Sequence, residues 1–547
     1  MTNFFSRPLT YIALLVFIIL GGWAYYLPAK IAQTLKFTVQ QQIGRDITFR
    51  SSGYSFSPQF GIAIRNVSVA GSDRLSNTVI SAETVLVPVG FFQLFTGRSS
   101  AETMLIDGAD IRVSLDGVGH TNVFEGESPK LITPMHLKLS NSRLHYFDER
   151  SGDQFGVEQI SGVADFDSEG GITSSGSAAI KGQFVKFDAN LASLERIFSD
   201  GSPFDLSVEG VATMFSFSGR LATAKRLNLV GQAEVISTDA VGLFKWLGAS
   251  VPHLSGIQNL TLKGAIDSDG PVLMLKAADL KLGTMTAKGD ISFSNAAERP
   301  NITAALGFDH LDLNLIRPAT DANWSDTAID FSGLNAADVQ FRLSANALEY
   351  GSLKTGAATV EGALQNRVLK AVIKSQDLAG GSGEFVVGLD STQLPPKLNL
   401  DVSLVKVAAM PGLSALINHS FLSGGLSLDS HFAATGNSHS EMMSTLRGDA
   451  TIAIAGGTIS GVTLKTIAAQ SGMSWNGGQT SNLNGQMKFT INEGVATLGE
   501  NQLDGGGFSL HSEGEIDLLR KSLDIVTGPV VKVKIQGLWH KPTLTPQ

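Results

Sequence analysis

The clearest fold signal in the chain is Lys397-Leu398-Asn399-Leu400-Asp401-Val402-Ser403-Leu404, in which polar and apolar residues alternate without a break. Successive side chains of a β-strand point to opposite faces, so this stretch predicts a strand with one apolar and one polar face. Antiparallel sheets with one solvated face have this pattern, whereas buried parallel sheets do not.

The same alternation of period two recurs over most of the chain after Asp46. It is visible in three further stretches, at 135–139, 260–267 and 311–315. Turn signals such as Asp107-Gly108, Asp269-Gly270 and Gly380-Gly381 separate these runs. The repeat is one of strand and turn and not of a fixed sequence period. The sequence therefore predicts a mainly β protein with a long, largely antiparallel sheet.

The N-terminus carries a long apolar segment. No charged residue lies between Leu9 and Leu27, and a helix of that length rises roughly 28 Å, close to the thickness of the hydrocarbon core of a bilayer. The segment predicts a transmembrane anchor, with Leu14, Leu15 and Phe17 in its core and Trp23 in an aromatic belt at the interface.

A cleaved signal peptide is the alternative, but its apolar core is usually shorter and ends at a small-residue cleavage site. Tyr25-Tyr26-Leu27-Pro28 is a poor site of that kind. Charges flanking the segment are nearly balanced, with Arg7 on one side and Lys30 and Lys36 on the other. The side of the membrane on which the body lies is therefore inferred from the β-rich, cysteine-free character of the body.

Helical patterns are few. Residues 28–44 repeat apolar residues every four positions, which predicts an amphipathic helix that either packs against the body or rests on the membrane surface. Three shorter helices are expected at 240–248, 411–418 and 439–446. In the last of these, Ser438 and Glu441 have the spacing of a capping box.

Bulk composition argues against several functional classes. The net charge is −9 with no basic block, so the chain lacks the electrostatic signature of a nucleic-acid-binding protein. It has no cysteine, which excludes disulfides, thiolate metal sites and a cysteine nucleophile. Common catalytic, nucleotide-binding and metalloprotease motifs are missing from the sequence. We expect a protein that is not an enzyme and needs neither a cofactor nor a metal.

The apolar strand faces must be covered by something. A second sheet would give a sandwich, and lipid chains lying on one curved sheet would give a groove. Alternation alone leaves both possibilities open. If a groove forms, the residues expected to contact lipid are Leu398, Leu400, Val402, Leu404, Leu260 and Leu262.

The C-terminal fifth resembles the AsmA family. The resemblance rests on Gly456-Gly457-Thr458-Ile459-Ser460-Gly461-Val462-Thr463-Leu464, on Met487–Gly494, on Gly514–Leu518, and on the closing segment Val533–Pro542 with Trp539. Earlier segments, including the anchor and Trp246-Leu247-Gly248, lie where AsmA proteins have comparable ones. Its motifs are loose, because the family is held together by pattern more than by invariant residues.

The resemblance implies a single-pass protein of the Gram-negative inner membrane with its body in the periplasm. Longer relatives form β-grooves that conduct phospholipid toward the outer membrane, and shorter members are linked to outer-membrane protein assembly and lipopolysaccharide balance. The resemblance thus favours a long, curved sheet that forms an elongated groove. Roughly thirty strands spaced about 4.8 Å apart would make this sheet about 140 Å long.

We accordingly expect residues 1–8 in the cytoplasm, an anchor at 9–27, an amphipathic helix at 28–44, a β-rich periplasmic body at 45–435 and an AsmA-like C-terminal region at 436–547. The expected function is phospholipid binding and transfer between inner and outer membrane, in support of outer-membrane biogenesis. The alternative is a non-catalytic assembly or scaffold factor for outer-membrane proteins or lipopolysaccharide homeostasis. Expected partners are the membrane, phospholipid and other envelope proteins.

Overall fold

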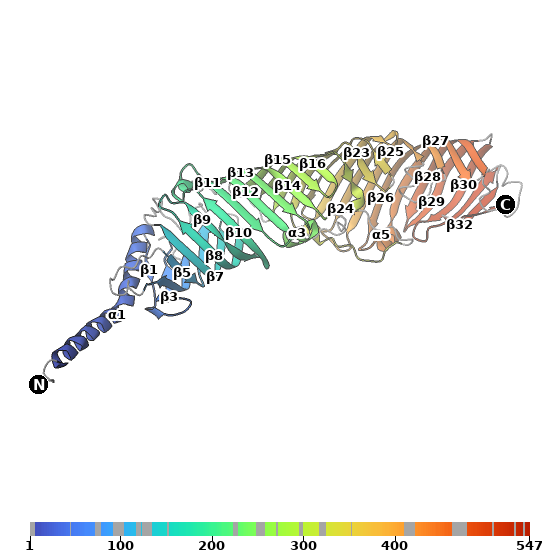
Figure 1. Cartoon of the computed structure of the whole chain (residues 1–547). Coiled ribbons are helices and arrows are strands. Elements are labelled where there is room, and N and C mark those ends of the chain that lie inside the picture. Colours follow the sequence, from blue (N-terminus) through green and yellow to red (C-terminus); the bar gives the residue numbers. More distant parts are fainter. Residues whose placement is uncertain are drawn as a thin grey trace. The chain divides into compact units, whose positions relative to one another are not determined.

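A computed structural model describes most of the chain (Figure 1). The described residues are 6–43, 45–71, 78–90, 103–115, 122, 134–149, 153–222, 228–247, 258–269, 272–294, 299–316, 324–351, 353–409, 422–461, 478–505, 508–529, 532–539 and 542–547.

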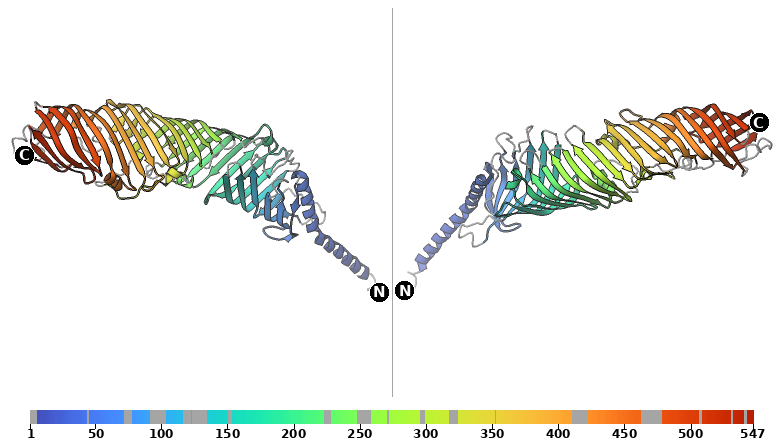
Figure 2. Two further views of the ribbon diagram at one scale, coloured as in Figure 1. Left: turned by 180° about the vertical axis from the view of Figure 1, so that it is seen from behind. Right: turned by 90° about the horizontal axis from the view of Figure 1, so that it is seen from above.

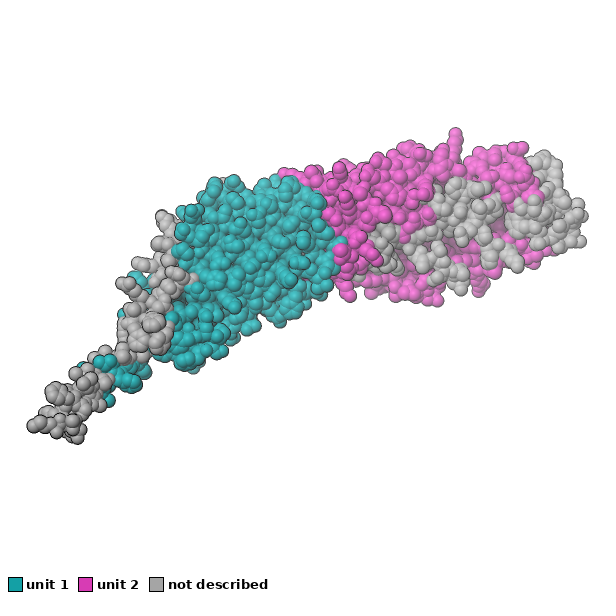
Figure 3. Space-filling model, viewed as in Figure 1, with its two compact units in different colours: residues 1–237, 263–274, 295–298 teal, residues 238–262, 275–294, 299–547 magenta. Residues whose placement is uncertain are grey.

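The protein is mainly β, as its alternating sequence predicts, with few helices among the described residues. Its α-helices there are α1 Ser6–Ile43, α3 Ala240–Leu247 and α5 His439–Thr445, and its 3-10 helices are η1 Glu195–Phe198, η2 Leu313–Ile316 and η3 Ser332–Asn335. The chain divides into two compact units, which are coloured separately in Figure 3. Unit 1 comprises residues 1–237, 263–274 and 295–298, and unit 2 comprises residues 238–262, 275–294 and 299–547.

Unit 1 stacks its strands mostly in chain order. From β7 to β13 each strand pairs antiparallel with the next, while β5 and β6 both run parallel to β7. The strands are β1 Ile47–Thr48, β2 Ser51–Ser55, β3 Gly61–Val69, β4 Ile80–Pro88, β5 Thr103–Asp107, β6 Asp110–Leu115, β7 Met135–Asp148, β8 Asp153–Phe166, β9 Ile172–Ile180, β10 Gln183–Leu191, β11 Ser202–Glu209, β12 Thr213–Ala222 and β13 Asn228–Ser237.

Two strands, β14 Leu260–Asp269 and β15 Val272–Leu282, have residues in both units. Unit 2 also has solenoid-like stacking, and from β22 to β33 each strand pairs antiparallel with the next (Figure 2). The one parallel pair of long strands described in this unit is β17 with β19.

The strands of unit 2 after β15 are β16 Met285–Ser294, β17 Asn301–Phe308, β18 Leu311–Asp312, β19 Asp338–Ala345, β20 Leu348–Tyr350, β21 Leu353–Thr355, β22 Ala358–Gln365, β23 Val368–Leu378, β24 Gly381–Asp390, β25 Lys397–Ala408, β26 Leu422–Thr435, β27 Arg447–Gly461, β28 Gly478–Asn492, β29 Val495–Gly505, β30 Phe508–Asp517, β31 Ser522–Pro529, β32 Val533–Leu538 and β33 Thr543–Pro546.

The N-terminal region forms one helix where the sequence suggested two segments. Helix α1 runs unbroken through Pro28 to Ile43. An internal proline removes one helical hydrogen bond, and packing of the adjacent turns offsets that loss, since Leu27, Ile31 and Ala32 are buried against Ile62 and other residues of unit 1. Of the two placements left open for residues 28–44, the described side chains thus favour packing against the body.

The anchor predicted over Leu9–Leu27 stays a prediction. In the part of the chain that the structure describes, no helix combines the length and the apolarity needed to cross a membrane. Leu14, Leu15 and Phe17 lie on α1 and are exposed, whereas the side chain of Trp23 lies outside the described residues.

Two of the three predicted short helices are confirmed. Helix α3 matches the prediction at 240–248, and α5 begins after Ser438, whose hydroxyl accepts a hydrogen bond from the Glu441 amide at 3.2 Å. The Glu441 carboxylate accepts in turn from the Asn437 amide at 2.7 Å, which satisfies a second amide at the helix start. The helix predicted at 411–418 lies outside the described residues.

The strand predicted over Leu311–Leu315 is wrong beyond Asp312. Strand β18 ends there, and η2 follows at once. The carboxylate of Asp312 accepts a hydrogen bond from the Asn314 amide at 2.9 Å. Such an Asx turn offers the backbone a local alternative to strand pairing, so the alternation of leucines does not continue the strand.

Candidate functional site

The most extensive feature of unit 2 is an uncharged row of side chains that crosses the sheet. In paired strands, directly opposite residues lie on the same face, so the strand registers define the row that contains Leu400. It comprises Ile291, Ala304, Phe341, Gly362, Ala371, Val387, Leu400, Phe432, Gly448, Ile491, Ala496, Ile516 and Leu523. It passes from β16 to β31 without a charged residue.

A second row on the same face contains Val402 and is also uncharged. It comprises Gly289, Leu306, Leu343, Val360, Ile373, Phe385, Val402, Ser430, Ala450, Phe489 and Leu498. We call the face that carries both rows the apolar face.

The opposite face of the same strands is charged. The row that contains Asp401 comprises Asp290, Ala305, Arg342, Glu361, Val372, Val386, Asp401, His431, Asp449, Thr490, Thr497, Glu515 and Asp524. Cross-strand ion pairs on this face include Arg342 with Glu361 at 3.0 Å and Lys534 with Asp524 at 3.1 Å. The Leu400 row thus has no charged residue, whereas the adjacent Asp401 row has several.

Large side chains of the Leu400 row remain partly open to solvent, whereas Leu306, Val402 and Leu498 of the second row are buried. In the Leu400 row, Phe341, Val387, Leu400, Phe432 and Ile516 are half-buried, although Ile491 is buried. Side chains between two closely packed sheets would mostly be buried, because protein interiors are close-packed. Partial exposure over so many strands is more typical of a face without a second protein layer.

The C-terminal part of the sheet is concave toward apolar side chains. Ile459 of β27 packs against a cluster formed by Leu510 of β30, Val533 of β32 and Leu544 of β33. Strands β27 and β30 are three steps apart, about 14 Å in a flat sheet. Side-chain contact needs heavy atoms within roughly 4.5 Å, so the sheet must bend to bring these side chains together.

One edge of the sheet in unit 2 is crossed by the segment 324–337, which precedes β19. The Trp324 indole donates to the Leu518 carbonyl at 2.9 Å, and the Ile329 amide donates to the Asn437 carbonyl at 2.8 Å. At the other end Arg299 holds Asp338 at 3.0 Å. The segment therefore connects the start of β19 with the turns that follow β26 and β30. These contacts restrain the distances between the three strands at this edge.

The predicted lipid-contacting residues fall into two groups. Leu398, Leu400, Val402 and Leu404 share the apolar face of β25, where Val402 and Leu404 are buried and the other two are half-buried. On β14, Leu260 is buried and Leu262 is half-buried. The described registers do not connect these two residues with the rows on β25.

A polar cluster surrounds His431 on the charged face. Its imidazole Nδ1 lies 3.0 Å from the Asp401 carboxylate, and its Nε2 lies 3.8 Å from Asp429. Hydrogen bonding to Asp401, together with the charges of Asp401, Asp449 and Asp429, raises the pKa of His431 above its ordinary value. In the described part of the chain, neither these groups nor any others form a set that could hold a metal ion.

We expect His431 to titrate at a higher pH than a free histidine in a full-length sample followed by NMR with labelled imidazole carbons. A raised folded-state pKa means that the ion pair stabilises the fold at pH values below the ordinary histidine pKa, and that this stabilisation is lost as pH rises through the folded-state pKa. Asp401→Asn should lower the titration midpoint of His431. An unchanged midpoint in that variant would show that Asp401 is not the cause.

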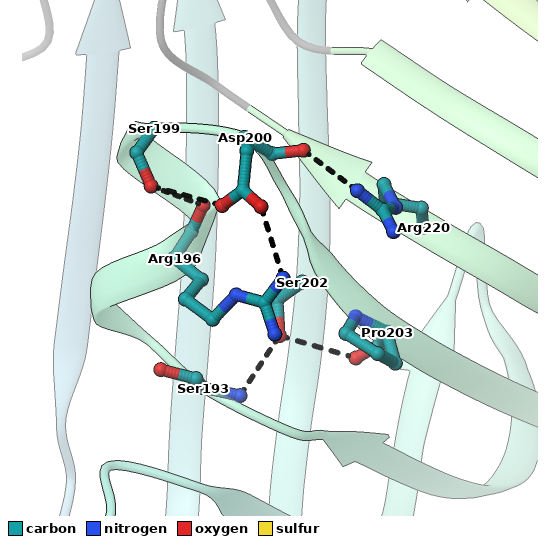
Figure 4. Close-up of polar contacts among 7 residues, drawn as sticks. All are labelled: Ser193, Arg196, Ser199, Asp200, Ser202, Pro203 and Arg220. Atoms are coloured by element: carbon teal, nitrogen blue, oxygen red, sulfur yellow. Dashed lines mark hydrogen bonds and ion pairs between the residues drawn. The ribbon is translucent and has the colours of Figure 1, made fainter.

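Another polar cluster lies in unit 1, between β10 and β11 (Figure 4). The Arg196 guanidinium contacts the Asp200 carboxylate at 2.9 Å, and Arg220 donates to the Asp200 carbonyl at 3.0 Å. The hydroxyl of Ser202 accepts from the Ser193 amide at 2.8 Å. Arg196 and Asp200 are both exposed. The contacts therefore stabilise the loop that connects β10 with β11 and do not form a buried catalytic group.

Sequence reasoning identified single strands but not the rows. Val387 and Phe432 lie beside Leu400 only because of the registers of β24 and β26. Alternation in each strand shows which residues share a face but not which residues of two strands are neighbours.

No protein family model, no curated protein and no solved structure matches this chain.

Proposed function

We propose that the apolar face of unit 2 binds the acyl chains of phospholipids and that the protein helps transfer phospholipid between the inner and outer membranes of a Gram-negative cell. The observation that carries the proposal is the continuity of the Leu400 row. Its side chains are uncharged from β16 to β31, and most of its large members are only partly buried. Acyl chains are a covering of the matching chemistry, since each buried methylene group contributes about 0.8 kcal/mol.

The row also suits movement along the sheet. A chain that lies across the strands exchanges one apolar neighbour for the next about every 4.8 Å. Burial is similar at each step, so no position holds the lipid much more tightly than the next. A phospholipid headgroup would stay at the solvated edge, because burying its charge without a partner is costly. This role requires no chemical step, so we propose a non-enzymatic protein.

The proposed location is the inner membrane, with a single anchor at Leu9–Leu27 and the body in the periplasm. Two features support this part of the proposal: the uncharged run in the sequence, and the large exposed apolar side chains that α1 presents from Leu14 to Ile18. The resemblance of the C-terminal region to the AsmA family points to the same location and to outer-membrane biogenesis.

A photo-crosslinking residue tests lipid binding on the apolar face. Leu400 is the best position, because it is half-buried, whereas Val402 is buried by protein neighbours. With the full chain in its native membranes, a crosslinker at 400 should capture phospholipid. A crosslinker at Asp401, which is adjacent but on the charged face, should capture little.

Equal capture at the two positions, or no lipid at 400 in a folded sample, would contradict the proposal. Protein in place of lipid at 400 would favour the alternative, in which the apolar face holds a client protein and the chain acts as an assembly factor.

A further inference from the structure

The β2–β3 hairpin of unit 1 carries an exposed aromatic tip. Phe56 is 80% exposed at the tip, and its ring lies 5.3 Å from that of Phe60, which stacks on Tyr54 at 5.9 Å. No charged residue occurs from Ser51 to Ile64. A phenylalanine that is almost fully exposed and backed by two further aromatic rings is a feature of surfaces that contact a partner or a membrane.

The packing of α1 shows which way this tip points. Ile47, just after the end of α1, pairs with Val69 at the far end of β3. Leu27 and Ile31 pack in one cluster with Ile62 and Ile64, which lie at the tip end of β3. Helix and strand therefore run in the same direction, and the hairpin tip, which precedes Gly61 at the start of β3, projects toward the N-terminal half of α1.

The tip points toward the part of α1 that carries two exposed tyrosines. Tyr25 and Tyr26 are 79% and 71% exposed, and they directly precede Leu27. Tyr54 pairs with Ile62, and Phe56 lies two residues beyond Tyr54, which is roughly 7 Å of extended chain and about the depth of one headgroup layer. Phe56 thus lies near the level of the tyrosines, where the sequence places the boundary between the anchor and water.

We propose that the β2–β3 hairpin is a second membrane contact, which inserts Phe56 into the interface of the same phospholipid bilayer that α1 enters. This inference rests on the proposed anchor. Aromatic side chains without nearby charges are favoured at that depth. A single helix can rotate about its own axis in a bilayer, whereas a helix and a hairpin tip together fix the orientation of β3 relative to the membrane.

Depth-dependent fluorescence quenching tests the inference. Because the chain has no cysteine, Phe56→Cys in the full-length protein accepts one environment-sensitive label. The sample is placed in nanodiscs of phosphatidylethanolamine and phosphatidylglycerol, with or without lipids brominated on the acyl chains. The label at 56 should be quenched several-fold more than one at Phe184→Cys, a 64% exposed phenylalanine on β10.

A label at Leu15→Cys separates the two claims. Quenching at 15 with no more quenching at 56 than at 184 overturns the hairpin contact and leaves the anchor in place. No quenching at 15 overturns the anchor itself. Because Phe56 is exposed, its replacement should not unfold the protein, and the ordinary β-rich circular dichroism spectrum of each labelled sample checks this.

Discussion

Val402→Asp should lower the free energy of unfolding by roughly 3–4 kcal/mol, the range expected for a carboxylate buried without a partner. Val402 is 8% exposed and belongs to a cluster with Leu378, Leu404 and Val407, against which Phe385 packs. A charge at this position would have no cation beside it, because its row is uncharged from β16 to β29.

The strand supplies a matched control. Val405 also lies on β25 but is 50% exposed, so Val405→Asp should change the free energy of unfolding by less than about 0.5 kcal/mol. Hydrogen exchange measured by mass spectrometry would localise the loss of protection to β23–β26. Equal effects of the two substitutions would mean that water reaches position 402, and the local core described for β25 would then be wrong.

Val402→Asp therefore measures protein packing and not lipid binding. Leu400, two residues away on the same face, is less buried than Val402, since it is half-buried. Val402 is covered by protein side chains, whereas Leu400 packs against the edge of the same cluster and stays partly exposed. A lipid reporter at 400 and a stability probe at 402 thus give independent results.

Gly448→Ala should be strongly destabilising, with a loss of about 2–4 kcal/mol. Gly448 lies in the Leu400 row with a φ of 150°, a conformation that L side chains rarely adopt. A Cβ at this position would meet the His431 carbonyl oxygen at 1.9 Å. Relief would require the backbones of β26 and β27 to move apart, which would break their hydrogen bonds.

Gly528→Ala is the corresponding control. Gly528 lies on β31, where a Cβ would meet nothing within 4 Å, so the change should stay within about 0.5 kcal/mol. Urea unfolding followed by tryptophan fluorescence would compare the two variants. If both unfold at the same denaturant concentration, the close approach of β26 and β27 at Gly448 is not required by the fold.

The sequence by itself determined the fold class and the faces of individual strands. Alternation in Lys397–Leu404 predicted the strand that became the first part of β25, and the Ser438 and Glu441 spacing predicted α5. These features are local: a period of two fixes which side chains share a face, and a cap is formed by residues three positions apart. A local hydrogen bond also explains why the strand predicted over Leu311–Leu315 ends at Asp312. The Asp312 side chain accepts from the Asn314 amide and so competes with strand pairing.

Only the tertiary structure decided which residues are neighbours across the sheet. The Leu400 row depends on registers that turns and bulges set, such as the irregularity between Leu404 and Val407. A shift of one residue would place the next strand's polar side chains beside Leu400. The contact of Ile459 with Leu510 and the reach of Trp324 to Leu518 join distant segments. Such contacts depend on how strands bend and stack, which the alternation within any one strand does not encode.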